Sequence, residues 1–219
     1  MGVRGYPIEM RTVVTAGPTR EYIDTVRFIS NASTGRMGRE VAAEAMRAGH
    51  DVTLLLGPGL VDSMDRTILD DCQIIPFISV SDLRGELGRR FEDCDALVMT
   101  AAVGDFRVEQ EFPAKIRRSD GPITLCMVPT EDVLAAVTKN KRDNQVVVAF
   151  AVEDGPRNEV EARARDELAA KNADFVVVNT LAAIAAQESL ACILSRGGVH
   201  LPWAMRSKAQ LAVEVVKLL

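Results

Sequence analysis

Short runs of consecutive apolar residues recur along the 219-residue chain, and segments of helix-forming composition separate them. Apolar runs without alternation are typical of strands buried on both faces of a parallel sheet. We therefore predict strands at 11–15, 51–56, 72–75, 96–100, 145–150 and 175–178, and helices at 38–48, at 158–171 and from a Ser81-Asp82 cap to about residue 92. This order predicts an α/β fold with a doubly wound, mostly parallel, Rossmann-like sheet and helices on both faces.

Two regions depart from this alternation. The segment 190–201 has the pattern of a β-hairpin that turns at Gly197-Gly198, and an amphipathic helix at 207–219 follows it. The stretch 104–127 carries charges and two prolines, which favours a two-stranded β excursion. We expect a single domain over 11–219, preceded by a mobile N-terminal extension at 1–10.

Composition excludes several classes of protein. Because the net charge is -5, with acidic and basic residues mixed along the chain, a nucleic-acid binder is not expected. No apolar stretch reaches the roughly 20 residues of a membrane span, and the N-terminus lacks the apolar core of a signal peptide, so the cytoplasm is expected. Two isolated histidines do not make a metal site. The four cysteines, Cys72, Cys94, Cys126 and Cys192, are expected to be reduced and buried.

The segment that follows the first predicted strand is unusually long for a loop between a strand and a helix. It runs from Thr15 to Glu40, whereas such loops usually have about 2–6 residues. It ends at a predicted helix start, where free backbone N–H groups can bind an anion, and Gly35 and Gly38 allow close approach to the backbone. The glycine spacing does not match the dinucleotide fingerprint G-x-G-x-x-G.

This segment resembles a known family signature. The matching residues are Thr15-Ala16-Gly17-Pro18-Thr19-Arg20-Glu21, Ile23-Asp24, Val26-Arg27, Ile29-Ser30-Asn31 and Gly35-Arg36-Met37-Gly38. They are similar to the opening of phosphopantothenate–cysteine ligases, which in many bacteria follow a flavin-dependent decarboxylase in one chain. The resemblance covers residues 11–180 well and implies a ligase of coenzyme A biosynthesis, here in a stand-alone form.

The resemblance implies a set of site residues. Asn31 would hold the acyl-nucleotide and act in catalysis. Arg20, Arg27 and Gly35 would bind substrate. The nucleotide would contact Ala101, Ala102, Asp105, Lys115, Glu131, Asp132, Phe150 and Lys171, and Lys115 would also act on the transferring phosphate. From the residues alone, plainer roles remain open: a cap or turn for Asn31 and Asp105, surface ion pairs for Arg20 and Arg27, and a charged edge strand that places Lys115 and Arg117 on one face.

The sequence also departs from the family pattern. Thr130-Glu131-Asp132-Val133 stands where Asn-Pro-Asp-Ile is usual, and Glu167 replaces a helix lysine four residues before Lys171. These changes leave open a catalytically impaired nucleotide-binding homologue with a regulatory or assembly role. A nicotinamide-dependent reductase is a weaker alternative, because neither Tyr6 nor Tyr22 has a lysine four residues later.

The resemblance further implies the ligands and partners. The substrates would be 4′-phosphopantothenate and L-cysteine, with CTP, or else ATP, as co-substrate together with Mg²⁺. Family members are dimers whose excursion and tail help to complete the partner's site, so we expect a homodimer. A separate decarboxylase is a further possible partner, whereas nucleic acid and membrane are not expected.

Overall fold

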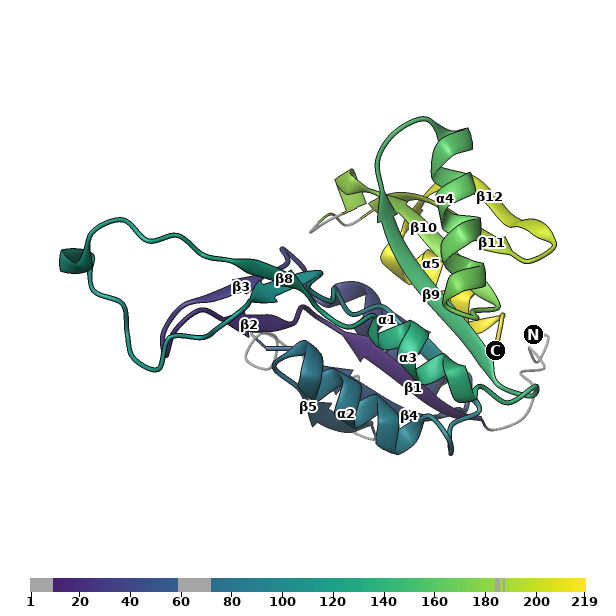
Figure 1. The fold of residues 1–219 in the computed structure, drawn as a ribbon. Helices are drawn as coiled ribbons and strands as arrows, with labels where there is room; N and C mark the ends of the chain where they lie inside the picture. The colour runs from purple at the N-terminus through teal and green to yellow at the C-terminus, as the bar shows by residue number, and fades with distance from the viewer. Residues whose placement is uncertain (1–9, 59–71, 184–185, 187) are drawn as a thin grey trace.

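The structure is a computed structural model that describes residues 10–58, 72–183, 186 and 188–219. Residues 1–9, which make up nearly all of the expected N-terminal extension, lie outside this part of the chain. Within it, one eight-stranded sheet has the order β12-β11-β10-β9-β6-β1-β4-β5 (Figure 1).

All six predicted parallel strands are present. They are β1 (Arg11–Ala16), β4 (Asp51–Leu56), β5 (Gln73–Pro76), β6 (Ala96–Met99), β9 (Val146–Glu153) and β10 (Phe175–Thr180). The predicted hairpin, β11 (Glu188–Ser195) and β12 (Gly198–Ser207), continues the sheet beyond β10 in antiparallel pairing. At the centre, Val14 of β1 aligns with Leu54 on one side and with Val98 on the other.

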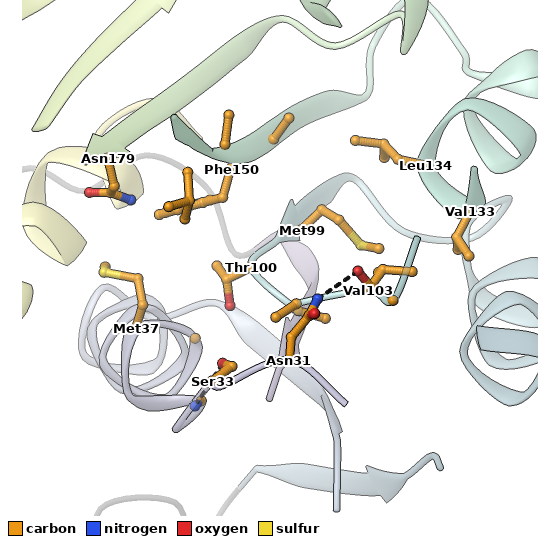
Figure 2. Close-up of a pocket in the computed structure, with 18 of the residues that line it drawn as sticks. Asn31, Ser33, Met37, Met99, Thr100, Val103, Val133, Leu134, Phe150 and Asn179 are labelled. Carbon is orange, nitrogen blue, oxygen red and sulfur yellow. Dashed lines mark hydrogen bonds between the residues drawn. The ribbon is translucent and has the colours of Figure 1, made fainter. Parts of the chain in front are cut away.

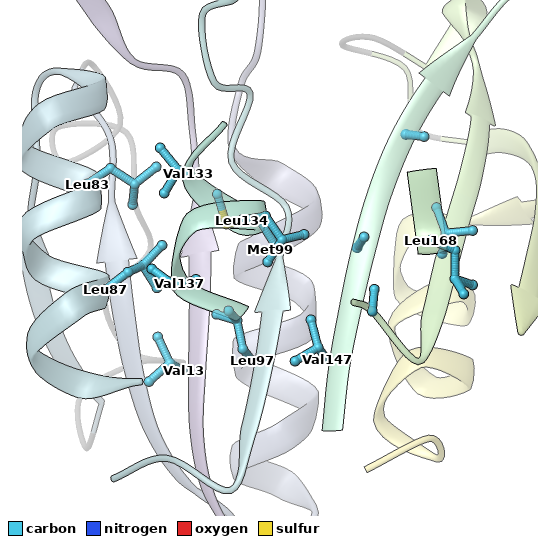
Figure 3. Close-up of a cluster of buried hydrophobic side chains, with 14 of the residues drawn as sticks. Val13, Leu83, Leu87, Leu97, Met99, Val133, Leu134, Val137, Val147 and Leu168 are labelled. Atoms are coloured by element: carbon cyan, nitrogen blue, oxygen red, sulfur yellow. The ribbon is translucent and has the colours of Figure 1, made fainter. Parts of the chain in front are cut away.

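Helices cover both faces of the sheet, which confirms the doubly wound fold. On one face lie α1 (Arg36–Arg47) and α5 (Lys208–Val216), and on the other lie α2 (Val80–Arg90), α3 (Val133–Val137) and α4 (Arg157–Ala170). Figure 3 shows the second face, where Leu87 of α2 and Val137 of α3 cover strand residues such as Leu97. Because β-strand side chains alternate, neighbouring strand residues such as Val13 and Val14 belong to opposite core clusters.

Some predicted boundaries are wrong. Helix α2 is capped at Ser79, not at Ser81-Asp82: the Ser79 hydroxyl accepts from Asp82 N, and the Asp82 carboxylate accepts from Ser79 N. Asp82 is thus the third helical residue of a capping box. Strand β9 continues to Glu153, three residues further than expected, and both hairpin strands are also longer than expected. No helix of the described residues is long and apolar enough to cross a membrane.

The cysteines follow their prediction only in part. Cys94 and Cys192 are buried, and burial raises the pKa of their thiols to about 11 and about 12. Cys72 is half-buried, and Cys126 is exposed, as are most residues of the surrounding segment 118–127.

An arm projects from the carboxyl edge of the sheet (Figure 1). It consists of residues 20–30, which form the hairpin of β2 (Arg20–Tyr22) and β3 (Phe28–Ser30), and residues 105–129, which include the paired β7 (Phe106–Val108) and β8 (Met127–Pro129). The predicted two-stranded excursion is therefore present. The segment around Lys115 and Arg117 is not a strand, however, so the predicted alternation there is wrong; a 3-10 turn, η3 (Arg118–Asp120), follows it.

Two further 3-10 turns complete the described elements. They are η4 (Thr138–Asn140), which continues α3, and η5 (Leu181–Ala183), which follows β10.

Candidate functional site

A cleft of about 530 Å³ opens at the carboxyl ends of β6, β9 and β10. Its walls are residues 31–38, 99–105, 130–134 and 149–153, together with Glu167, Lys171, Asn179 and Lys208. The chain goes from β1 outward to β4 and then returns to β6 on the other side of β1. Ligands of open α/β sheets bind beside such a reversal of strand order, so this is the expected position for a ligand site.

The start of α1 forms one wall of the cleft. Gly35 is its N-cap, in a left-handed conformation with φ 63°, and no side chain caps the helix. The free N–H groups of the first turn therefore remain available to an anion. Gly38 brings this turn against the sheet, because a Cβ there would lie 2.4 Å from Thr100 Oγ1 and 2.7 Å from the Thr15 carbonyl oxygen.

Asn31 and the segment after β6 are held together. The Asn31 amide nitrogen donates to the Val103 carbonyl at 2.9 Å, which leaves Asn31 Oδ1 as an acceptor (Figure 2). Thr19 fixes the same segment from the other side: its backbone N–H donates to the Ala102 carbonyl at 3.2 Å, and its hydroxyl accepts from Gly104 N at 2.9 Å. The two signature segments thus meet although about 70 residues separate them.

The cleft brings most of the predicted site residues together. Those that line it are Asn31, Gly35, Ala101, Ala102, Asp105, Glu131, Asp132, Phe150 and Lys171. Asp105, Glu131 and Asp132 are exposed at its rim, whereas Phe150 is half-buried in its wall. Asp132 is also the N-cap of α3 and accepts from Ala135 N at 3.0 Å.

Three predicted residues lie on the arm, outside this cleft. The Arg20 guanidinium stacks over the Phe28 ring at 4.2 Å. Arg27 pairs with Asp24 and donates to the Ile116 carbonyl at 3.1 Å. Lys115 is exposed farther along the arm. A role of these residues in the same cleft would need the arm to move or to belong to another copy of the chain.

Two carboxylates lie close to the Lys171 ammonium group. Its Nζ atom lies 3.3 Å from Glu167 Oε2, one helical turn back on α4, and 4.0 Å from Asp132 Oδ2. Glu131 pairs with Arg84 at 3.5 Å, and Glu153 pairs with Arg163 at 2.9 Å. The departure at Glu167 therefore has a structural consequence, because part of the Lys171 charge is neutralised within the chain.

The carboxylates of the cleft are the candidate protein ligands of the expected Mg²⁺. Within the described residues, no three His, Cys, Asp or Glu side chains are grouped to hold a metal ion. Mg²⁺ in nucleotide sites usually keeps one or two carboxylates and takes its other ligands from phosphates and water. Asp105, Asp132 or Glu167 fits that limited role, so an ion that arrives with a nucleotide is compatible with these residues.

Three further residues line the cleft; Arg36 and Asn179 fall on positions of the family pattern but had no role assigned from the sequence. Arg36, Asn179 and Lys208 line the cleft, and Asn179 is buried, with an Oδ1 that has no hydrogen-bond partner in the described residues. Asn179 follows an apolar strand run, where a polar residue is a recognisable signal of a carboxyl-edge site. No sequence feature marked Lys208 as a cleft residue, because its place at this edge of the sheet depends on the direction in which β12 runs.

Known proteins resemble this chain over nearly its whole length. Residues 8–219 match the family described as the DNA/pantothenate metabolism flavoprotein C-terminal domain. The coenzyme A biosynthesis bifunctional protein CoaBC of Bacillus subtilis (strain 168) is 34% identical over 216 residues, which are 96% of this chain and 51% of that protein. The chain thus spans about half the length of this curated relative.

Solved structures share the fold. The DNA/pantothenate metabolism flavoprotein from Streptococcus pneumoniae superposes with a TM-score of 0.82 at 23% identity, over 95% of this chain and 97% of that one. A Cab2 variant in complex with phosphopantothenate-cysteine gives a TM-score of 0.77 at 18% identity, over 95% of this chain and 85% of that one. Since the family match extends over almost the whole sequence, the chain belongs to the DNA/pantothenate metabolism flavoprotein C-terminal domain family.

Proposed function

We propose that this chain joins 4′-phosphopantothenate to L-cysteine at the expense of a nucleoside triphosphate. The observation that carries the proposal is the cleft itself, where Asn31, the 101–105 segment, Phe150 and Lys171 converge at the carboxyl edge of the sheet. Membership of a pantothenate-metabolism family and the similarity to a bifunctional protein of coenzyme A biosynthesis support it.

The proposed reaction has two steps. A carboxylate oxygen of phosphopantothenate bonds to the α-phosphorus as the bond to the bridging oxygen breaks, and pyrophosphate leaves with the electron pair. The cysteine amine then attacks the acyl carbon, loses a proton and displaces the nucleoside monophosphate. Such a site must hold anions, stabilise a developing oxyanion and keep water from the mixed anhydride.

The residues of the cleft suit these tasks. The Asn31 amide is fixed by Val103, so its position is set before substrate arrives. The uncapped first turn of α1 offers N–H donors to phosphate oxygens. Phe150 provides an apolar surface on which a nucleobase can stack. We expect CTP to be preferred to ATP, with Mg²⁺ bound to the nucleotide phosphates.

Pyrophosphate release tests the proposal directly. The assay combines the protein with phosphopantothenate and each nucleoside triphosphate in turn, first without cysteine and then with it. We expect release without cysteine, and formation of phosphopantothenoylcysteine once cysteine is added. Faster or equal turnover with ATP would contradict the CTP preference, and no phosphopantothenate-dependent release would contradict the ligase assignment.

Asn31→Ala separates the two steps in the same assay. If the amide acts mainly after activation, the variant still releases pyrophosphate but accumulates the acyl-nucleotide, which mass spectrometry detects. Asn140→Ala, at an exposed asparagine in η4, is the matched control and should behave like wild type. Wild-type amide formation in Asn31→Ala would reduce Asn31 to a structural role.

The ion pair at Lys171 favours a second candidate function. If Glu167 withdraws Lys171 from the nucleotide, the chain could bind nucleotide without catalysis and serve as a regulatory or assembly module. This alternative predicts that CTP binds in calorimetry while no pyrophosphate forms with any nucleotide. Turnover with phosphopantothenate and cysteine would exclude it.

A further inference from the structure

The segment after β6 is held in the cleft by its backbone carbonyl groups. Four consecutive carbonyl oxygens, those of residues 102–105, each accept a hydrogen bond. The opening signature supplies the first two bonds, from the Thr19 N–H and from the Asn31 amide (Figure 2). Thr130, which lies directly after β8 and also lines the cleft, supplies the last two. One residue from a third segment of the chain therefore makes half of these contacts.

Thr130 uses two donors for these contacts. Its hydroxyl donates to the Gly104 carbonyl at 2.5 Å, and its backbone N–H donates to the Asp105 carbonyl at 2.9 Å. The second bond continues the pairing of β7 with β8, in which Phe106 lies opposite Pro129. Any residue except proline can make that second bond, whereas the first needs a side chain that carries a donor. The choice of residue at position 130 therefore determines the contact to Gly104.

This contact fixes the backbone that carries Asp105. The Gly104 carbonyl belongs to the planar peptide unit whose other end is the Asp105 nitrogen, so a bond to that carbonyl orients the start of residue 105. The Asp105 carboxylate is exposed in the cleft and forms no hydrogen bond or ion pair within the described part of the chain. The place of this carboxylate is therefore determined by its backbone and not by contacts of its own.

The same bond also changes the electrostatics of the cleft. The proposed ligands are anions, and the oxygen end of a peptide dipole repels them. A hydroxyl proton on the Gly104 oxygen reduces this repulsion, and backbone groups that are fixed before a ligand arrives need no reorganisation when it binds. Loss of the Thr130 hydroxyl would leave the half-buried Gly104 carbonyl without this donor, at a cost in free energy.

We propose that Thr130 is a positioning residue of the ligase site: its hydroxyl holds the peptide between Gly104 and Asp105 so that the Asp105 carboxylate meets the nucleotide. This inference rests on the proposed function. Thr130 stands where asparagine is usual in the family pattern. Because the asparagine amide is also a hydrogen-bond donor, this departure retains the chemistry that the Gly104 carbonyl needs, and it does not by itself indicate an impaired homologue.

A double-mutant cycle on CTP affinity, measured by calorimetry without turnover, tests whether Thr130 acts through Asp105. Thr130→Val has nearly the same shape but no hydroxyl, and Asp105→Asn removes the carboxylate charge. We expect each single variant to bind CTP about tenfold more weakly, and Thr130→Val to add less than about threefold in the Asp105→Asn background. Effects that multiply in the double variant would overturn the inference, as would wild-type CTP affinity in either single variant.

Two further variants separate the hydroxyl from general packing. Thr130→Ser keeps the donor and should bind CTP within about twofold of the wild type. Thr53→Val removes a half-buried hydroxyl that donates to Gln73 Oε1 at 3.3 Å and does not line the cleft, so CTP affinity should not change. CTP binding as weak in Thr130→Ser as in Thr130→Val would overturn the role of the hydroxyl. Circular dichroism confirms that each variant is folded.

Turnover distinguishes this inference from the proposed function. In the ligase assay, Thr130→Val should raise KM for CTP by about tenfold and leave KM for cysteine unchanged. If the wild type shows no ligase turnover but the CTP cycle still couples Thr130 to Asp105, the proposed function fails while the positioning role stands. If the wild type turns over and the cycle shows no coupling, the positioning role alone fails.

Discussion

Gly38 is the residue at which α1 comes closest to the sheet. An added Cβ would lie 2.4 Å from Thr100 Oγ1 and 2.5 Å from Ala16 Cβ, so Gly38→Ala must push the helix away from β1. We expect a loss of about 1–3 kcal/mol in the free energy of unfolding, as for other overpacked sites. The same shift moves the N-terminus of α1 within the cleft, so nucleotide affinity should fall as well. Urea unfolding and calorimetric titration with CTP measure the two effects.

Gly85→Ala is the control for this substitution. Gly85 lies inside α2, and the nearest atom to an added Cβ is 4.0 Å away at the end of the Arg89 side chain. Alanine is the better helix former, so this variant should be more stable by about 0.5–1 kcal/mol. A Gly38→Ala protein with wild-type stability and nucleotide affinity would show that the close approach of α1 is not required.

The Glu167 carboxylate determines how much of the positive charge of Lys171 remains available to a bound ligand. Removing the carboxylate in Glu167→Gln, or reversing it in Glu167→Lys, should lower KM for the nucleotide. The reason is that a carboxylate about 4 Å from a phosphate costs about 1 kcal/mol in a water-like dielectric. Since 39% of the Glu167 side chain is exposed, screening limits the gain to about fivefold at most.

The control for Glu167 is its neighbour on α4. Asp166→Asn removes an exposed carboxylate that does not line the cleft, so KM should not change. Loss of activity in Glu167→Lys would instead mean that the carboxylate takes part in the reaction, and the assignment of this end of the cleft to phosphate would be wrong.

At the scale of elements, a buried carboxylate helps to join the two halves of the arm. Asp24 accepts hydrogen bonds from the backbone N–H groups of Val26 at 2.8 Å, Arg27 at 2.7 Å and Ile116 at 3.1 Å. Burial by itself would raise the pKa of Asp24, but these bonds and the Arg27 guanidinium outweigh it and lower the pKa to about 2. Asp24 thus joins the β2–β3 hairpin to the loop that carries Lys115.

The lowered pKa makes the attachment of the arm sensitive to acid. Because the folded pKa lies below the ordinary value of 3.8, the stabilising contribution is complete above about pH 4 and is lost as pH falls towards 2. The amide resonance of Ile116 should titrate with a midpoint at about pH 2. Asp24→Asn should abolish this titration and speed proteolytic cleavage of the 109–126 loop. Asp143→Asn, at an exposed turn, should do neither; a midpoint near 4 in the wild type would contradict the assignment.

The elements differ in how far the sequence predicts them. The central strands were predictable because they are buried on both faces, so most of their residues are apolar; Thr12 and Thr15 of β1 are buried exceptions. The β2–β3 hairpin was missed, because Arg20–Tyr22 and Phe28–Ser30 are strands of only three residues that depend on pairing with each other. Ser79 was missed as the cap because Ser81 is an equally good cap by residue type; the local signal that distinguishes them is Asp82, which completes a capping box with Ser79 and not with Ser81.

At the scale of the whole molecule, the site depends on topology more than on any one motif. The sequence alone assigns the opening signature and the residues at strand ends, such as Asn31, Asp105 and Phe150, to one edge of a parallel sheet. It does not assign Lys208, because the position of this lysine requires that β12 run parallel to β10, and a hairpin pattern does not fix this. Arg20, Arg27 and Lys115 were predicted to serve the site, yet the fold places all three on the arm.

The arm also exposes apolar side chains that a second copy of the chain could cover. Large apolar residues on its surface are Val26, Phe28, Phe106, Phe112, Ile123 and Met127, with relative exposures between 37% and 54%. A monomer rarely exposes so many on one thin projection. Since Lys115 lies on this projection and outside the cleft of its own chain, we predict a homodimer in which the arm of one protomer reaches the cleft of the other. Light scattering at assay concentration should give the mass of a dimer.

Mixing two inactive variants tests whether the site is shared. Asn31→Ala disables the cleft, and Lys115→Ala disables the arm, so each homodimer should be inactive. If the arm serves the partner's cleft, a mixed dimer has one site with both defects and one intact site. Random reassortment makes half of the dimers mixed, so activity should return to about a quarter of the wild-type value. If the arm instead serves its own cleft, every site in the mixture carries one defect and no activity returns. Full activity of Lys115→Ala alone would remove this lysine from the reaction altogether.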